Sequence, residues 1–545
     1  MGQVTKTPPP DHLTMCLFAP GMSALHRAGL GGLACTLRAM ERQHEAGLLK
    51  ASKLPAPFKA GNPPWEITET SVTLRFGKPE NAEEYLKKLF EFAFEVRKDG
   101  LINLPGQYAN GQTPSAAILA DLQAGAILTF LQHGKVRQLA KEPTTVSYDP
   151  EGQGVPGVIV EYRKCAYFKH QDAWEQLLDK GRLQSRPIKV DGPISPGTVV
   201  RHVAYTGDTA AEDPVERMLP LVFALVGCLP LPVNRGVAAL LVPEVEDLTE
   251  FLADRPAMTP TAARECQVAN AADAALQAQV RLRGRRAMQG SAVPGCYAMT
   301  FMPTAWASQQ KSRVATIHVD RGRDKVLDRF DRALACLPLR VVTRTIKEST
   351  GRGKQKQTTE RKESFRTDSV IRPLIADNLA LGRPWYAGFV KLMSKVNPAT
   401  DKPYRDQLSY ERKGLHDMMN DNSMWDHEGE ALVVKAVHEA MRMRYGQIAD
   451  ENKGKSVAMK NRMDRFREKL RLDLAGAKTE GHVRFALTDL YSRAGNNPIL
   501  REGWQKVLLI LRRDWQLARD LGLLALASYV GKGEAGEVIE PSESK

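Results

Sequence analysis

The sequence contains 545 residues, of which 43% are hydrophobic and 26% are charged, a balance typical of a globular protein with about two to four domains. Lysine and arginine number 77 against 63 acidic residues, which gives a net charge of +14. This excess favours a polyanionic partner, because phosphates bind lysine and arginine and release counterions. The longest apolar run, residues 218–233, contains three prolines and is too short to span a bilayer, so no membrane partner is expected.

The seven cysteines form no C-x-x-C pair, and their number is odd. This pattern indicates reduced, buried thiols in a cytoplasmic protein and argues against a disulfide or zinc framework.

The chain begins with a predicted strand over residues 13–19 and a helix over residues 23–46, for which Ser23 is a good N-cap. Three glycines, Gly29, Gly31 and Gly32, lie inside this helix. A glycine in a helix costs on the order of 1 kcal/mol against alanine, so we expect another backbone to pack closely there.

A strand over residues 65–76 and a helix over residues 80–96 follow, and they lead into a loop that is rich in glycine and amides. Amide side chains can read base edges, although an ordinary turn cluster has the same composition. The candidate amides of this loop are Asn103, Gln107, Asn110 and Gln112.

Strand and helix patterns alternate irregularly as far as an amphipathic helix at residues 323–335. This order predicts an α+β body over residues 1–338 rather than a doubly wound sheet. One helix, residues 269–288, ends in a cluster of four arginines that we predict to contact phosphates. Complementing the helix dipole would account for one or two of them. The four are Arg281, Arg283, Arg285 and Arg286.

Residues 339–371 are predicted to form a basic hairpin or linker, with strands at 339–346 and 364–371. A basic tip can reach a groove or a phosphate backbone, and a solvated linker is the alternative. The candidate ligands are Arg344, Lys347, Arg352, Lys354 and Lys356.

Strand patterns end at about residue 369, and four amphipathic stripes predict a bundle of four or five helices over residues 372–530. Residues 531–545 are predicted to be a disordered acidic tail. Between residues 453 and 471, eight basic residues face two acids on a helix whose other face is apolar. Such a helix could line a groove for a nucleic-acid strand, or it could be an ordinary solvated face. The candidates on it are Arg462, Arg465 and Lys469.

The sequence holds no G-x-x-x-x-G-K-[ST], H-E-x-x-H or G-x-S-x-G motif. We therefore predict a protein without a catalytic centre, a metal or a cofactor. Two alternatives stay open. One is a metal-dependent nuclease near the His416–Asp417 pair, which is the dipeptide of HD phosphohydrolases, and the other is a basic scaffold protein of another nucleoprotein complex.

Three segments carry a resemblance to a known family: residues 17–33 (LFAPGMSALHRAGLGGL), 241–248 (LVPEVEDL) and 268–276 (VANAADAAL). With the order of a mixed body followed by a helical bundle, the chain resembles the large subunit of type I CRISPR effector complexes (Cascade), in the MYXAN subtype of the Cas-eight family.

The resemblance implies a prokaryotic protein that binds the 5′ end of the CRISPR RNA and recognises the protospacer-adjacent motif on double-stranded DNA. It further implies promotion of the R-loop and guidance of the displaced strand. The implied protein partners are the Cascade backbone and handle-binding Cas subunits, with a helicase–nuclease or a transposition-targeting protein downstream.

The bundle resembles the small subunit of Cascade, which implies that small-subunit copies can arise from an internal start in the same gene. The candidate starts are Met393, Met418, Met419 and Met424.

Overall fold

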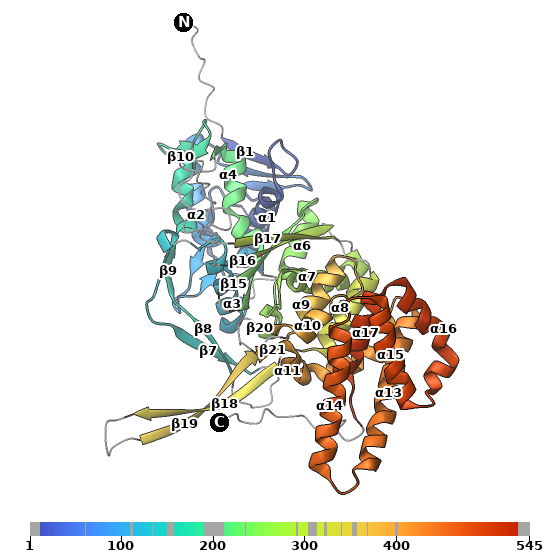
Figure 1. Ribbon diagram of the computed structural model, residues 1–545. Helices are drawn as coiled ribbons and strands as arrows, with labels where there is room; N and C mark the ends of the chain where they lie inside the picture. The colour runs from blue at the N-terminus through green and yellow to red at the C-terminus, as the bar shows by residue number, and fades with distance from the viewer. Residues whose placement is uncertain are drawn as a thin grey trace, which may run out of the picture. The chain divides into compact units, whose positions relative to one another are not determined.

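The computed structural model describes residues 11–59, 61–108, 113–132, 134–149, 157–189, 212–234, 236–289, 293–302, 313–320, 324–338, 340–350, 357–367, 369–397 and 402–531. The chain divides into two units (Figure 1). We call Met1–Gly322 with Val341–Thr367 the body, and Arg323–Arg340 with Asp368–Lys545 the helical unit. The predicted fold class, a mixed body followed by an all-helical C-terminal region, is confirmed.

The body contains two antiparallel sheets, one mixed sheet and several two-stranded ladders. The first antiparallel sheet has the order β1-β3-β2, with β1 (His12–Cys16), β2 (Trp65–Ile67) and β3 (Ser71–Arg75). The second has the order β14-β15-β16-β17, with β14 (Leu229–Asn234), β15 (Val237–Pro243), β16 (Gly295–Met302) and β17 (Arg313–Asp320). The single strand expected over residues 65–76 is thus two strands, because a turn at Thr68 separates them.

The mixed sheet has the order β18-β19-β8-β7, with β7 (Thr144–Tyr148), β8 (Val158–Tyr162), β18 (Arg340–Thr350) and β19 (Gln357–Thr367). The two-stranded ladders pair β4 (Glu95–Val96) with β5 (Ile102–Asn103), β6 (Arg137–Leu139) with β9 (Cys165–Phe168), β10 (Leu178–Asp179) with β11 (Arg182–Leu183), and β12 (Ile188–Lys189) with β13 (Glu212–Asp213).

Seven α-helices are described in the body. They are α1 (Ala24–Glu45), α2 (Ala82–Ala93), α3 (Ala116–Leu128), α4 (Val215–Val222), α5 (Ala224–Gly227), α6 (Leu248–Met258) and α7 (Ala271–Gln289). Ser23 caps α1, because its side chain accepts a hydrogen bond from the backbone N–H of His26. The imidazole of His26 in turn contacts Asp213, at 3.2 Å from Nε2 to the carboxylate.

Glycine sets how closely α1 packs against α4 and α5. A Cβ atom added at Gly29 would lie 1.9 Å from the carbonyl oxygen of Pro220, and one added at Gly227 would lie 1.8 Å from that of Ala28. At Gly32 it would lie 2.5 Å from the backbone nitrogen of Gly227. The close backbone contact expected from the glycines of this helix is therefore confirmed.

A fully buried arginine joins α6 to its neighbours in the body. Arg255 donates hydrogen bonds to the carbonyl oxygens of Val226 and Cys228, both at 2.8 Å, and to the hydroxyl of Thr259 at 2.7 Å. The Thr259 hydroxyl donates onward to the carbonyl of Gln107 at 2.8 Å. The N–H groups of the guanidinium are thus hydrogen-bonded to protein oxygens. A buried cation needs such partners, because it has lost its contacts with water.

The hairpin β18–β19 belongs to the body. Ser364 of β19 pairs in parallel with Val158 of β8. Arg366 forms an ion pair of 2.8 Å with the buried carboxylate of Asp121 and lies 5.4 Å from the centroid of the Tyr148 ring. These contacts attach the base of the hairpin to the body, whereas the sequence had placed residues 339–371 in a segment of their own.

The helical unit consists of ten described α-helices and one short ladder of β20 (Val396–Asn397) with β21 (Lys402–Pro403). The helices are α8 (Asp324–Cys336), α9 (Arg372–Ala380), α10 (Val390–Ser394), α11 (Tyr404–Leu408), α12 (Arg412–Met419), α13 (Glu428–Glu451), α14 (Ser456–Ala475), α15 (Glu480–Ala494), α16 (Pro498–Arg513) and α17 (Trp515–Ser528). The long helix α13 packs against α15, α16 and α17, and its apolar side is buried at Val433, Val437 and Met441.

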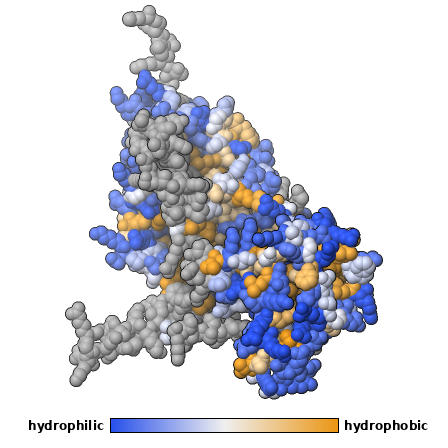
Figure 2. Space-filling model, viewed as in Figure 1, coloured by the Kyte–Doolittle hydropathy of each residue, from blue (hydrophilic) through white to orange (hydrophobic). Residues whose placement is uncertain are grey.

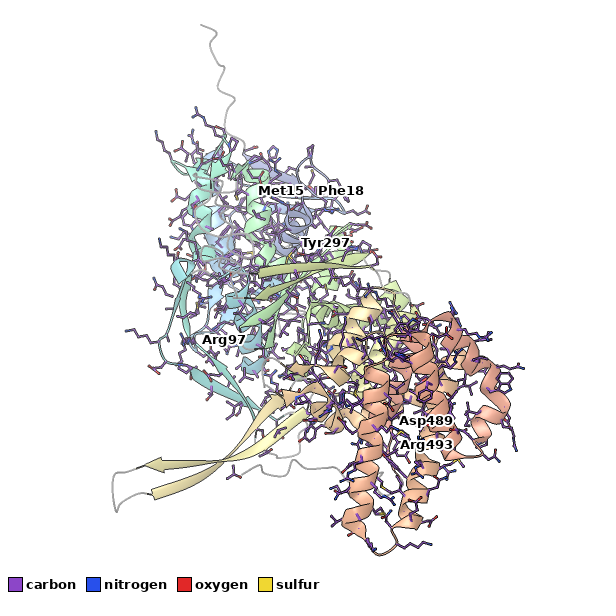
Figure 3. The ribbon with its side chains drawn as sticks, in the orientation of Figure 1. Met15, Phe18, Arg97, Tyr297, Asp489 and Arg493 are labelled. Carbon is purple, nitrogen blue, oxygen red and sulfur yellow. The ribbon has the colours of Figure 1, made fainter. Side chains whose placement is uncertain are left out.

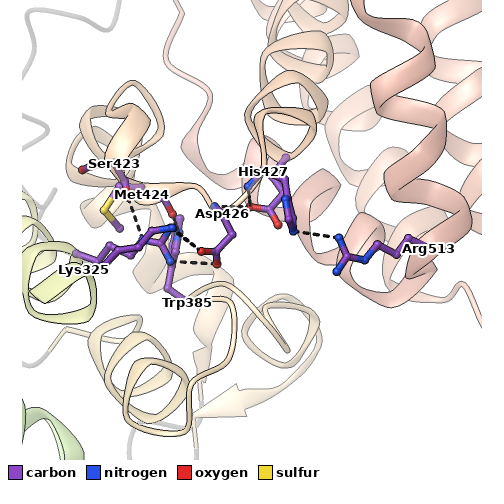
Figure 4. Close-up of polar contacts among 9 residues, drawn as sticks. Lys325, Trp385, Ser423, Met424, Asp426, His427 and Arg513 are labelled. Carbon is purple, nitrogen blue, oxygen red and sulfur yellow. Dashed lines mark hydrogen bonds and ion pairs between the residues drawn. The ribbon is translucent and has the colours of Figure 1, made fainter. Parts of the chain in front are cut away.

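Helix α8 is bonded to the helical unit, although the sequence had assigned residues 323–338 to the body. Its residues Lys325 and Arg329 both contact the carboxylate of Asp426, at 3.0 Å each. Arg329 also donates from Nε to the carbonyl of Ser423. Figure 4 shows Lys325 beside the carboxylate of Asp426. Trp385 donates to the carbonyl of Met424 from the same region at 3.0 Å. The partners of Lys325 and Arg329 lie 94 to 101 residues further along the chain, so local sequence patterns do not reveal them.

Substitution of Gly29 or Gly227 by alanine should destabilise the body, because the new methyl group would overlap a backbone atom of the facing helix. We expect a loss of about 1–3 kcal/mol or more in the free energy of unfolding. Gly446 of α13 is the control, since a Cβ added there meets nothing within 4 Å, and its replacement by alanine should stabilise the helix slightly. Equal denaturation midpoints for Gly29→Ala and the parent chain would contradict the proposed contact.

Candidate nucleic-acid interface

In the arginine cluster at the end of α7, Arg281 and Arg283 are half-buried. Arg281 donates from Nε and Nη2 to the carbonyl of Met258, at 3.1 and 2.9 Å. Burial lowers the pKa of this guanidinium, and its bonds hold α7 against the end of α6. Arg281 is therefore corrected from a phosphate ligand to a structural residue. The side chains of Arg285 and Arg286 lie outside the described part.

The amide loop contributes to the fold at both positions that the structure describes. The amide of Asn103 donates to Glu95 at 2.6 Å, and that of Gln107 donates to the carbonyl of Leu225 at 2.9 Å. Both residues are buried. Reading a base edge requires an exposed amide, so Asn103 and Gln107 are corrected to structural residues. Asn110 and Gln112 lie outside the described residues.

The hairpin consists of two paired strands, β18 and β19, whose base is held by the Arg366–Asp121 ion pair. Arg344 and Lys347 lie on β18, but their side chains lie outside the described part. Arg352, Lys354 and Lys356 also lie outside the described residues. The structure thus gives the attachment of the hairpin and not the geometry of its basic side chains.

Helix α14 presents the predicted basic residues to solvent. Arg462, Arg465 and Lys469 are all exposed, and their spacing of three and four residues puts them on one face of the helix. Arg462 makes an ion pair of 2.9 Å with Glu451 of α13. Figure 2 shows a largely hydrophilic surface over this part of the helical unit. We call these three residues the α14 stripe.

Two exposed aromatic residues on the next helices were missed in the sequence. Phe485 of α15 is 72% exposed, and Trp504 of α16 is 53% exposed. Each has an exposed arginine close by on its own helix, Arg484 beside Phe485 and Arg501 one turn before Trp504. The sequence pattern had assigned Trp504 to an apolar stripe, and only the packing shows that the ring faces solvent.

Arg484 and Arg493 of α15 each pair with an acid one turn earlier on the same helix, and Arg484 lies 3.5 Å from Glu480. Arg493 pairs with Asp489 of its own helix at 2.8 Å, and the two side chains lie together in Figure 3. Such a pair one turn apart on a helix is an ordinary surface feature of small energetic value. We therefore leave both arginines out of the candidate interface.

A basic cavity of about 600 Å³ in the helical unit was also missed in the sequence. Its cations come from separate elements: Arg332 from α8, Arg340 from the start of β18, and Lys413 from α12. The guanidinium of Arg340 lies 4.3 Å from the centroid of the Tyr410 ring. Because these residues are up to about 80 positions apart, the sequence contains no local cluster of charge that would predict the cavity.

Glu411 forms part of the cavity wall and is buried. It accepts a hydrogen bond from the backbone N–H of Ile371 at 3.3 Å. Burial raises the pKa of Glu411 to about 7, and the nearby Arg340 and hydrogen bonds from residues 369–371 oppose that shift in part. The wall therefore gains negative charge as the pH rises through neutrality.

The HD dipeptide does not lie in a cluster of metal ligands. The ring of His416 stacks on that of His438, with centroids 5.9 Å apart. Within the described ranges, no group of three or more histidine, cysteine, aspartate or glutamate side chains could hold a metal ion. All seven cysteines are free, and five of them are buried. Among the helices of the described residues, none has the length and apolar character needed to cross a membrane.

Comparison with known proteins gives two domain matches. The family model of the DevT N-terminal domain matches residues 14–222, from β1 to the end of α4, and that of the DevT C-terminal domain matches residues 421–545. The chain therefore has the domain pair of DevT-type proteins. It is 35% identical over 554 residues to the CRISPR-associated protein Cas8a1/Csx13 of Myxococcus xanthus (strain DK1622), with 98% of this chain and 92% of that protein covered. The chain belongs to this Myxococcus-type Cas8 family, which confirms the resemblance inferred from the sequence.

Replacement of Glu411 by glutamine should make stability less dependent on pH. The folded protein binds the Glu411 proton more tightly than the unfolded chain, where the pKa is near 4.5. The associated stability is therefore fully present below pH 4.5 and is lost as the pH rises through 7. We expect Glu411→Gln to raise the unfolding free energy relative to the parent by about 1–3 kcal/mol more at pH 8 than at pH 5.5.

Glu468 provides the matched control, because its hydrogen bond from Arg471 lowers the pKa to about 2. Glu468→Gln should therefore change thermal stability by the same amount at pH 5.5 and at pH 8. A Glu411→Gln effect that is also independent of pH would contradict the raised pKa.

Proposed function

We propose that this protein is the large subunit of a type I CRISPR surveillance complex (Cascade), acting in the prokaryotic cytoplasm. The observation that carries the proposal is the 35% identity to Cas8a1/Csx13 across 98% of the chain. In this role the protein binds the 5′ end of the CRISPR RNA, recognises the protospacer-adjacent motif on duplex DNA and promotes the R-loop. Base pairing by the guide reads the target sequence, and the protein reads the flanking motif and the backbone. We propose no catalytic role for it.

The body is proposed to contact the RNA handle and the duplex. The anchored hairpin supports this, because the Arg366–Asp121 pair fixes the base from which its basic strands extend. The proposed ligands are therefore the hairpin residues and the remaining arginines of α7. They are Arg283, Arg285, Arg286, Arg344, Lys347, Arg352, Lys354 and Lys356. For the flanking motif itself, Asn110 and Gln112 remain candidates.

The helical unit is proposed to guide the displaced strand. Its support is the combination of the exposed α14 stripe with the exposed rings of Phe485 and Trp504. Cationic side chains follow a phosphate backbone, and aromatic rings stack on bases without regard to sequence. This is the combination of groups that single-strand binding requires.

The DevT C-terminal match starts at residue 421, three positions before Met424. We propose that translation from an internal methionine supplies separate small-subunit copies, with Met393, Met418, Met419 and Met424 as candidate starts. Any of these products would lack Gly388 and Val390, whose backbone N–H groups donate to the buried carboxylate of Asp520. Such copies would therefore need another partner, or water, at Asp520.

Other Cas subunits form the backbone of the proposed complex and bind the handle. A helicase–nuclease or a transposition-targeting protein is proposed to receive the opened target. Their docking surfaces are not assigned to residues of this chain.

Co-expression with a CRISPR array and the neighbouring Cas genes tests this assignment. A C-terminal tag on this chain should recover CRISPR RNA and backbone subunits in one particle that opens duplex targets carrying the right flanking motif. The same tag should show a second, shorter band that disappears when the used internal methionine is changed to leucine. Recovery of the chain alone, without RNA and without effect on target binding, would contradict the proposed function. A single band would contradict the use of an internal start.

Charge reversal of the α14 stripe should weaken binding of the displaced strand. We expect Arg462→Glu, Arg465→Glu and Lys469→Glu together to reduce affinity for single-stranded DNA by on the order of tenfold or more. The slope of log affinity against log salt should fall by about 2, since each lost phosphate contact removes about 0.7. Permanganate footprints on the displaced strand give an independent measure.

The control reverses three exposed lysines of the body, Lys50, Lys53 and Lys87, with the same change in net charge. It should leave the protection of the displaced strand unchanged. Alanine at Phe485 or Trp504 should cost about 1–3 kcal/mol of single-strand binding with little change in the salt slope. Equal losses in the lysine control and the stripe variant would assign the effect to net charge alone.

A further inference from the structure

The basic cavity of the helical unit is built where α8 and α12 come into backbone contact. A Cβ atom added at Gly414 of α12 would lie 2.0 Å from the carbonyl oxygen of Cys336 at the end of α8. The absence of a side chain therefore lets the two helices touch. Beside this contact, Leu337 and Pro338 continue the chain towards Arg340 and complete an apolar part of the wall.

The cavity carries three cations, and their surroundings differ. Arg332 is held by Asp421 at 3.0 Å, and the guanidinium of Arg340 lies over the Tyr410 ring. Lys413 is exposed, and no ion pair to it is recorded within the described part of the chain. Asp417, one turn after Lys413 on α12, adds an acceptor to the rim. The lining therefore combines three cations with the carboxylates of Glu411 and Asp417.

Tyr410 gives the cavity a flat ring that is partly free. The Arg340 guanidinium lies 4.3 Å from the ring centroid, and the tyrosine remains 43% exposed. A cation packed on an aromatic ring orients that ring and fixes its position. The remaining exposed surface is suited to stacking by another planar group, which an isolated phosphate or carboxylate ligand would not use.

We propose that this cavity binds one nucleotide of a single-stranded nucleic acid, with the base stacked on Tyr410 and the adjoining phosphate between Lys413 and Arg332. The inference rests on the proposed function and adds to it a second contact site, separate from the α14 stripe and the exposed rings of α15 and α16. A volume of about 600 Å³ lies within the range of small-ligand sites. Asp417 and Asn420 at the rim supply an acceptor and an amide for the base edge.

Photocrosslinking of the assembled complex tests the site directly. In one arm the displaced DNA strand carries 4-thiothymidine, and in the other the CRISPR RNA carries 4-thiouridine. After irradiation and proteolysis, mass spectrometry should find a nucleotide adduct on the peptide that contains Tyr410 in one of the two arms. That arm identifies whether the nucleotide comes from DNA or from RNA. Adducts that never include this peptide would overturn the proposal.

Thiol protection provides a second readout without substitution of the cavity. Cys336 lines the cavity and is partly exposed, whereas Cys16 is an exposed thiol of the body. Binding of a 20-nucleotide single strand to the full-length chain should slow alkylation of Cys336 at least severalfold and leave Cys16 unaffected. Inorganic phosphate at the same phosphate concentration should protect much less. Equal protection by phosphate would overturn the role of the base.

Two substitutions separate the contributions of ring and charge. Tyr410→Ala should weaken crosslinking and Cys336 protection by about 5- to 100-fold, the range for loss of one stacked base, while Tyr410→Phe should retain both. Lys413→Glu, at an exposed position that the fold tolerates, should also reduce both and flatten the salt dependence. Unchanged protection in Tyr410→Ala and Lys413→Glu would overturn the proposal.

Failure of this inference differs from failure of the proposed function. If the complex assembles and opens its target while the Tyr410 peptide and Cys336 stay unaffected, only the cavity assignment falls. If the chain does not assemble with RNA and Cas subunits, the proposed function falls, and the oligonucleotide experiment on the isolated chain still decides whether the cavity binds a nucleotide.

Discussion

The contact of α1 with α4 and α5 is the constraint on which the body depends. It brings backbone against backbone at Gly29, Gly32 and Gly227, where no larger residue fits without moving a helix. Close packing of this kind fixes the position of α5, and the carbonyls at its end, Val226 and Cys228, are those to which Arg255 donates. The same arginine then holds Thr259 and, through it, the segment at Gln107. Steric and polar constraints therefore form one continuous chain through the core.

Arginine has two opposite uses in this protein, and sequence alone does not separate them. Arg255, Arg281 and Arg366 direct their guanidinium groups at carbonyls or at a buried carboxylate, so they stabilise the fold. Arg465 of α14 is exposed and available to a partner. A basic cluster in the sequence reports local charge, whereas burial depends on elements that are distant along the chain. Local charge therefore predicts phosphate binding for Arg281, although its partner is the carbonyl of Met258.

Regular patterns made much of the fold predictable. The glycines of α1 indicated a close backbone contact, and the apolar stripes from residue 432 onward indicated the helices of the bundle, because both signals are local. The docking of α8 and the parallel pairing of β19 with β8 depend on long-range contacts, such as Arg329 with Ser423 and Ser364 with Val158. The cavity at Tyr410 could not be predicted from the sequence for the same reason, since its cations come from three separate segments.

The assignment of α8 to the helical unit has a consequence for synthesis on the ribosome. Lys325 is made 101 residues before its partner Asp426, and the hairpin of the body is made between them. Helix α8 is therefore synthesised before its partners, and the last segment of the body is synthesised in between. Until those partners emerge, the apolar face of Leu327 and Phe330, which is buried in the folded protein, stays uncovered. Synthesis from the N-terminus then favours folding of the body before folding of the helical unit. During this interval the uncovered apolar face of α8 is a binding site for a chaperone.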